Sequence, residues 1–146
     1  MSLQKPETIM STISEIEDTL ITTITNLALF KLVDSLGRKD EPVTLNYPAA
    51  FVYFAGDKNT ESQPRPIFIT DYDVLVIVKN LRSEDKAAKD AYALIDAVRD
   101  AINGKALSIT DIEKFICMSR ELTGYEAGII TYRLQFQARH YLAVPS

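Results

Sequence analysis

Apolar residues recur at steps of three and four positions between residues 13 and 36, which is the period of one helix face. Ser14 and Glu17 have the spacing of a capping box, in which each side chain accepts a hydrogen bond from a backbone N–H group at the helix start. Gly37 can adopt the positive φ that is common just after a helix. The pattern predicts one long amphipathic helix over residues 13–36.

A second apolar stripe with helical spacing runs through residues 84–102, where Ser83 is the candidate cap and the pair Asn103 and Gly104 marks the end. Its members are Ala88, Ala91, Tyr92, Ile95, Val98 and Ile102. The stripe predicts a second long helix with one buried face.

Two extended stretches lie between these helices. Residues 49–55, "AAFVYFA", carry no charge, which is typical of a central strand covered on both faces, and residues 67–78 predict a longer strand. The segment between them, "GDKNTESQPRP" at 56–66, is rich in turn formers and charge, so we expect a long exposed loop.

Two more strands follow the second helix. Residues 115–121 predict one strand, and "TGYEAG" at 123–128 predicts the turn of a β-hairpin. The last strand alternates, with Ile130, Tyr132, Leu134, Phe136 and Ala138 expected to face inward. Its outward residues, named the polar row, are Thr131, Arg133, Gln135, Gln137 and Arg139.

The order α-β-β-α-β-β predicts a single α+β domain over residues 13–146, preceded by a flexible N-terminal tail at 1–12. Paired strands separated by helices favour a mainly antiparallel or mixed four-stranded sheet with the two helices packed on one face. No internal repeat or low-complexity segment changes this picture.

Composition narrows the functional classes. A chain of 146 residues that is 47% hydrophobic can bury a core without disulfides or metals. The net charge of −4 gives no basic surface for sequence-specific nucleic-acid binding. A single cysteine, Cys117, excludes an internal disulfide and fits a reducing compartment such as the cytoplasm. No stretch has the length and apolarity of a secretion signal or a membrane span, so we expect a soluble protein.

Candidate catalytic groups are few. The only histidine, His140, lies at the end of the last strand, where an ordinary surface residue is the simplest interpretation. Asp71 and Asp73 point to one strand face and could share a proton or a cation, but exposure of that face explains them without a site. Cys117 has apolar neighbours, which favour a buried structural thiol. We therefore expect no enzyme, no cofactor and no metal.

The order and spacing of several segments nevertheless resemble a family. "ISEIEDTLI", "YPAAFVYFAG", "AYALIDAVRDAINGK" and "GIITYRLQF" are similar to segments of the Mu-like phage tail proteins, which are in turn similar to phage tail terminators. The resemblance covers about residues 13–141. It implies a virion structural protein made in the bacterial host, which forms a homo-oligomeric ring, a hexamer, that caps the tail tube and offers a docking surface to the head–tail connector. The ring lumen would pass DNA without gripping it.

The layout of the chain suggests two contact surfaces for such a ring. Arg133, Gln135, Gln137 and Arg139 of the polar row could meet a neighbouring subunit, because arginine is enriched at protein interfaces. The loop that contains Asp57, Lys58, Asn59 and Arg65 could reach the tail tube. Both assignments are hypotheses.

An alternative interpretation belongs to a different class. Phe51, Tyr53 and Tyr72 could line the pocket of a small-molecule-binding or enzymatic α+β domain. Alternation along the strand argues against a pocket that contains every aromatic residue of the run, because Phe51 and Tyr53 share one face while Phe54 lies on the other. A second alternative within the tail is a baseplate component.

Overall fold

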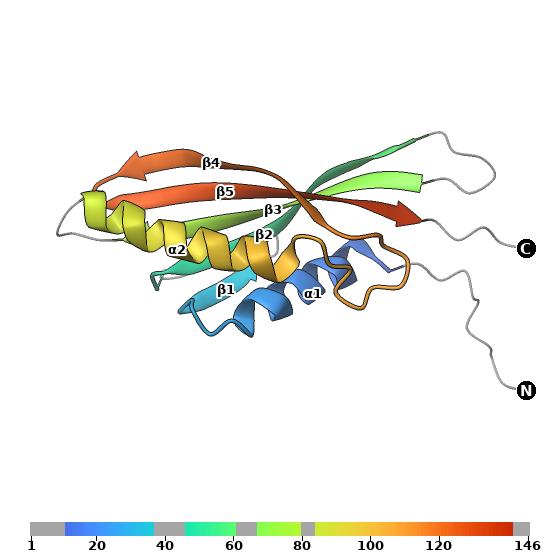
Figure 1. Ribbon diagram of the computed structural model, residues 1–146, viewed down its shortest axis with the longest axis horizontal. Coiled ribbons are helices and arrows are strands. Elements are labelled where there is room, and N and C mark those ends of the chain that lie inside the picture. Colours follow the sequence, from blue (N-terminus) through green and yellow to red (C-terminus); the bar gives the residue numbers. More distant parts are fainter. Residues whose placement is uncertain (1–10, 37–45, 61–66, 80–83, 142–146) are drawn as a thin grey trace, which may run out of the picture.

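The computed structural model describes residues 11–36, 46–60, 67–79 and 84–141 (Figure 1). Its elements in chain order are α1 (Ile13–Thr25), β1 (Leu32–Ser35), β2 (Ala49–Asn59), β3 (Ile67–Lys79), α2 (Glu84–Ile102), β4 (Ile116–Glu126) and β5 (Ile129–Tyr141). The α+β class is as predicted, with one strand more than the sequence suggested. Residues 1–10 of the predicted N-terminal tail, the candidate cap Ser83 and Gly37 lie outside the described residues.

The five strands form one sheet in the order β1-β2-β3-β5-β4. β1 runs parallel to β2, whereas the other neighbouring pairs are antiparallel. The sheet is therefore mixed and five-stranded rather than four-stranded. It twists so strongly that β2 lies below β3 at the left of Figure 1 and above it at the right. α1 begins and β5 ends at the same end of the molecule as the β2–β3 hairpin (Figure 1).

The first helix is shorter than predicted, since α1 ends at Thr25 instead of continuing to residue 36. Its capping box pairs Thr12 with Glu15, not Ser14 with Glu17. Threonine side chains within α1 donate hydrogen bonds to carbonyl oxygens four residues earlier, a contact that weakens and bends helices. Ala28 then adopts a left-handed φ of 57°, which breaks the helical path. The chain continues into β1 rather than a further helical turn.

Both helices cover one face of the sheet, as the apolar stripes predicted, although Tyr92 of the second stripe is exposed (Figure 1). The helices contribute Ile16, Leu20, Ile24, Ala91, Ile95, Val98 and Ile102 to the buried core. The sheet contributes Ala50, Val52, Tyr72, Val74, Val76, Val78, Leu134, Phe136 and Ala138. Burial of these side chains is the main stabilising contribution to the fold, at about 25 cal/mol per Å² of apolar surface.

The predicted loop at 56–66 is partly strand, because β2 continues to Asn59. A β-bulge at Ala55 shifts the register between Phe54 and Gly56 and lets pairing with β3 resume. Gly56 has a φ of 144°, a conformation that favours glycine. The bulge thus extends the β2–β3 hairpin well beyond the apolar run.

The β4–β5 hairpin is confirmed, with a tighter turn than predicted. β4 extends to Glu126, and the two residues Ala127 and Gly128 make the turn with φ of 51° and 80°. Positive φ at both central residues matches the twist of the flanking strands. Met118 and Thr123 lie at two register shifts in β4, so this edge strand is irregular.

Candidate interaction surface

The polar row lies on the sheet face opposite the helices, as predicted. On the other face of β5, Ile130, Leu134, Phe136 and Ala138 are buried in the core. Of the polar row, only Arg139 is exposed, while its other members are partly buried. The whole sheet face that carries the polar row, on the side away from the two helices, is called the helix-free face below.

Two glutamines of the polar row are held by neighbouring strands. Ser119 Oγ of β4 donates a hydrogen bond to Gln135 Oε1 over 2.5 Å, and Gln137 Nε2 donates to Asp71 Oδ1 of β3 over 3.0 Å. Because these side chains are fixed before any partner arrives, the row presents a largely pre-organised polar surface. Pre-organisation reduces the entropy cost of binding.

Asp73 lies buried on the helix-free face, with 3% of its surface exposed. Tyr53 donates its hydroxyl proton to Asp73 Oδ2 over 3.1 Å, whereas Asp73 Oδ1 is buried without a hydrogen bond among the described residues. Burial raises the pKa of the Asp73 carboxyl group, although Tyr53 and Arg133 act in the opposite direction. The expectation that exposure explains this aspartate is therefore wrong, since neighbouring side chains cover it.

Arg133 forms an ion pair with Glu121 of β4 across the same face. Its Nε atom is buried without a hydrogen bond among the described residues. The positive charge of Arg133 partly offsets the rise that burial causes in the pKa of Asp73. The helix-free face thus combines satisfied pairs with two buried polar atoms, Asp73 Oδ1 and Arg133 Nε, that have no hydrogen bond within the described parts of the chain.

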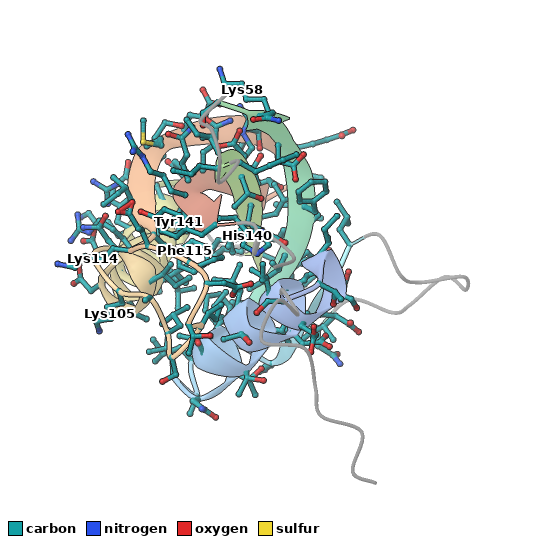
Figure 2. The ribbon with its side chains drawn as sticks, turned by 90° about the vertical axis from the view of Figure 1, so that its right-hand side faces the viewer. Lys58, Lys105, Lys114, Phe115, His140 and Tyr141 are labelled. Carbon is teal, nitrogen blue, oxygen red and sulfur yellow. The ribbon has the colours of Figure 1, made fainter. Side chains whose placement is uncertain are left out.

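Asp57, Lys58 and Asn59 are exposed residues of β2, not of a loop. They pair with Thr70, Ile69 and Phe68 of β3. Figure 2 shows Lys58 at the margin of this end of the molecule, on the opposite side from α1. The fourth predicted residue, Arg65, lies outside the described residues. The candidate tail-tube contact therefore includes a rigid hairpin strand.

The aromatic residues of the alternative pocket do not converge. Tyr72 is buried on the helix side, where its hydroxyl donates to the Ile13 carbonyl oxygen over 3.2 Å and its ring lies 5.4 Å from that of Phe54. Tyr53 is opposite Asp73 of β3 and so lies on the helix-free face. Phe51 is two residues earlier in the same strand and therefore lies on the same face. Because the three side chains point to two sides of the sheet, they do not form one pocket.

A shallow hollow of about 690 Å³ lies elsewhere, where β4 diverges from β5. It is lined by Ile69, Ala106, Ile112, Glu113, Lys114, Ile116, Gln137, Ala138 and Arg139. These side chains mix apolar, acidic and basic groups and include no nucleophile with an adjacent base. The hollow matches neither predicted site, although it shares Gln137 and Arg139 with the polar row.

His140 is buried rather than an ordinary surface residue. Its Nε2 lies 3.0 Å from Asp111 Oδ2, and the same carboxylate accepts hydrogen bonds from the Ser11 backbone and hydroxyl groups. Burial alone would raise the pKa of Asp111, but the bonds from Ser11 and His140 hold it below its usual range. Since Ser11 contacts the aspartate and not the histidine, the arrangement anchors α1 and is not a nucleophile relay. The alternation of β5, continued from Ala138, could have indicated this burial.

Among the described residues, no three acidic, histidine or cysteine side chains group as metal ligands. Within the same ranges, no helix combines the length and apolarity needed to cross a membrane. The described residues thus form an α+β domain with a twisted sheet, one helix-covered face and one pre-organised polar face.

Comparison with known proteins places this chain in a family. The model of the phage tail terminator protein matches residues 10–144, so the chain belongs to the phage tail terminator family. The resemblance to tail terminators is confirmed, while its Mu-like part stays a prediction. Membership of this family gives the protein a structural role in a phage tail and a place in the virion.

A solved structure shares the fold. A chain in the virion of a native gene transfer agent particle superposes with a TM-score of 0.63 at 14% sequence identity, over 89% of this chain and 98% of that chain. At this identity the likeness establishes the fold alone. A comparison with curated proteins finds no match.

Proposed function

We propose that this protein is the tail terminator subunit that assembles into a ring, taken as a hexamer, on the finished tail tube and stops its growth. The family match over residues 10–144 carries the proposal. The partners are further copies of this chain, the tail tube protein and the head–tail connector. The mechanism is surface complementarity, so the protein is non-enzymatic and needs no cofactor.

The polar row supplies one surface of the ring contact. Ser119 and Asp71 hold its two glutamines in place, whereas Arg139 remains exposed. A neighbouring subunit that meets this face gains charge-assisted hydrogen bonds to arginine without ordering the glutamines. Hydrogen bonds to the buried Asp73 Oδ1 and Arg133 Nε would require rearrangement, so we do not include them in the contact.

The β2–β3 hairpin supplies the contact to the tube. Asp57, Lys58 and Asn59 are exposed residues at the end of β2, with Lys58 at the margin of the molecule in Figure 2, and Arg65 follows them in the sequence outside the described residues. Pairing with β3 fixes the backbone of these three residues, which lowers the entropy cost of a contact with a repeating tube surface. The lumen passes DNA, and a net charge of −4 avoids a tight hold on phosphates.

Sedimentation velocity tests the ring directly. We expect the wild-type chain to form one discrete oligomer and the double variant Arg133→Glu and Arg139→Glu to dissociate toward monomers. An unchanged oligomer removes both arginines from the interface but leaves the ring intact. A wild-type chain that stays monomeric at all concentrations and on tail tubes contradicts the ring. A ring found only at the distal end of the tail would instead indicate a baseplate component.

A further inference from the structure

The edge strand β4 carries an unusual share of exposed apolar side chains. Ile116, Met118, Leu122 and Tyr125 are 44% to 56% exposed, and they are half of the large hydrophobic residues exposed in the described parts of the chain. A gathering of exposed apolar side chains on one strand can mark a protein interface. The edge itself, rather than one face of the sheet, is thus a candidate contact.

These side chains lie on both faces of the β4 edge. Ile116 is opposite Gln137 and so belongs to the helix-free face, whereas Leu122 and Tyr125 are opposite Tyr132 and Ile130 on the helix side. A partner lying on one face would cover only part of this set. A partner that continues the sheet beyond β4 would lie along the edge itself, where it can meet side chains that point to either face, Leu122 and Tyr125 among them.

Charged side chains on an edge strand usually hinder its pairing with another chain, but two of those in β4 already form ion pairs within this chain. Arg120 is paired with Asp96 of α2 over 2.7 Å, and Glu121 is paired with Arg133. At the start of the strand, the Asn103 side chain accepts the Cys117 N–H group over 2.8 Å and closes the edge there. Among the described residues, no strand lies beyond β4, so the part of β4 after Cys117 is the part that a partner can reach.

The opposite edge of the same sheet, strand β1, has features that match those of the β4 edge. β1 is flanked by Leu29 and Leu36, which are 45% and 47% exposed. Since β1 runs with β2 and β5, and β4 runs against them, a second copy in the same orientation would bring its β1 antiparallel to β4. In that arrangement the end of β4, at exposed Glu126, lies beside the start of β1, at exposed Lys31. The two charges are opposite.

We infer that the β4 edge of one copy docks on the β1 edge of the next, with Glu126 facing Lys31 of the neighbouring copy. The contact is head-to-tail, so repeated copies can close a ring. Because β1 has only four residues, apolar side chains contribute more to this contact than backbone pairing does. The inference rests on the proposed ring and adds the two sheet edges to the polar row as surfaces through which its subunits meet.

A charge-swap series on the full chain tests this contact. The variants are Glu126→Lys, Lys31→Glu and the two combined, compared by sedimentation velocity over a range of concentrations. Each single change places like charges together, so we expect the dissociation constant between subunits to rise roughly tenfold. The combined change restores opposite charges, and we expect assembly to return. Lys105→Glu is the matched control, since Lys105 is exposed and its backbone bridges Phe115, before the part of β4 that the neighbouring copy would meet.

The outcomes separate this contact from the ring itself. A wild-type ring that survives both single changes overturns the edge contact and leaves the proposed function standing. Single variants that dissociate without recovery in the combined variant overturn the pairing of Glu126 with Lys31. A wild-type chain that never assembles overturns the ring and the edge contact together. Circular dichroism of each variant confirms that the chain is folded, so that loss of assembly is not loss of structure.

Discussion

The hydroxyl group of Tyr53 donates a hydrogen bond to Asp73 Oδ2 over 3.1 Å on the sheet face that carries no helix. This pair places a carboxyl group in a buried position beside the polar row, where its other oxygen has no hydrogen bond among the described residues. A buried carboxylate with one unsatisfied oxygen costs free energy of folding. The pair therefore adds a polar group to the helix-free face and lowers the free energy of unfolding of the protein.

Replacing the buried carboxyl group gives the first prediction. Burial raises the pKa of Asp73, so the folded state binds its proton more tightly than the unfolded state. The charged carboxylate therefore lowers the free energy of unfolding. This loss of stability is absent below the ordinary pKa of 3.8, grows as the pH rises through the pKa of Asp73 in the folded state, and is complete above it. We expect Asp73→Asn to be more stable than the wild type at pH 7, with a difference that shrinks toward pH 3. Denaturant unfolding from pH 3 to 7 measures this, and a pH-independent difference contradicts it.

The anchor of α1 should show the opposite pH dependence. Hydrogen bonds from Ser11 and His140 lower the pKa of Asp111, so its contribution is present above the ordinary pKa of 3.8 and is lost as the pH falls through the folded pKa. We expect Asp111→Asn to lower the free energy of unfolding by about 2 kcal/mol at pH 7. The loss should disappear in acid. Equal destabilisation at pH 2.5 and pH 7 would show that the charge of Asp111 is unimportant.

Two isoleucines of α1 form a matched pair for the core. Ile16 is 1% exposed and packs under the sheet, whereas Ile13 is 48% exposed on the same helix. We expect Ile16→Ala to cost about 2–5 kcal/mol of unfolding free energy, because it removes buried methyl groups and leaves a cavity. Ile13→Ala should cost less than about 1 kcal/mol. Similar losses for both variants in thermal or denaturant unfolding would mean that α1 packs through a different face.

The bulge in β2 predicts a site where only glycine fits well. A Cβ atom at Gly56 would meet nothing within 4 Å, so any penalty for Gly56→Ala comes from its φ of 144°. We expect a loss of about 1–3 kcal/mol. Gly124→Ala is the control, since its Cβ atom would make an ordinary contact 3.8 Å from Thr131 Cβ. Unfolding measurements that show equal, small changes for both variants would contradict strain at Gly56.

Much of the fold could be predicted from the sequence, but the end of α1 could not. Leu27, Phe30 and Val33 follow α1 at three-residue steps, and all three pack against the core. Their spacing imitates a helix face although the chain has already turned into β1. A pattern of burial cannot by itself distinguish these paths, because both bury the same residues. The parallel pairing of β1 with β2 depends on contacts between distant residues.

Some features of the candidate interaction surface could likewise be predicted from the sequence, and others could not. The alternation of β5 correctly places the polar row on one face, since the side-chain period of a strand is fixed. Burial of Asp73 could not be read from its neighbours in sequence, because Tyr53 and Arg133 approach it from other strands. The turn chemistry of residues 123–128 predicts no strand there, so the continuation of β4 to Glu126, with Tyr125 exposed on its edge, does not follow from the sequence pattern.

The most direct test of the central claim is the growth of tail tubes. Purified tube protein of the same phage would be polymerised, given this chain, and then supplied with more tube protein, with lengths and ends recorded by electron microscopy. We predict that tubes carry a ring at one end and stop elongating there. Tubes that lengthen as fast with the chain as without it, and that carry no ring, would contradict its role as a tail terminator.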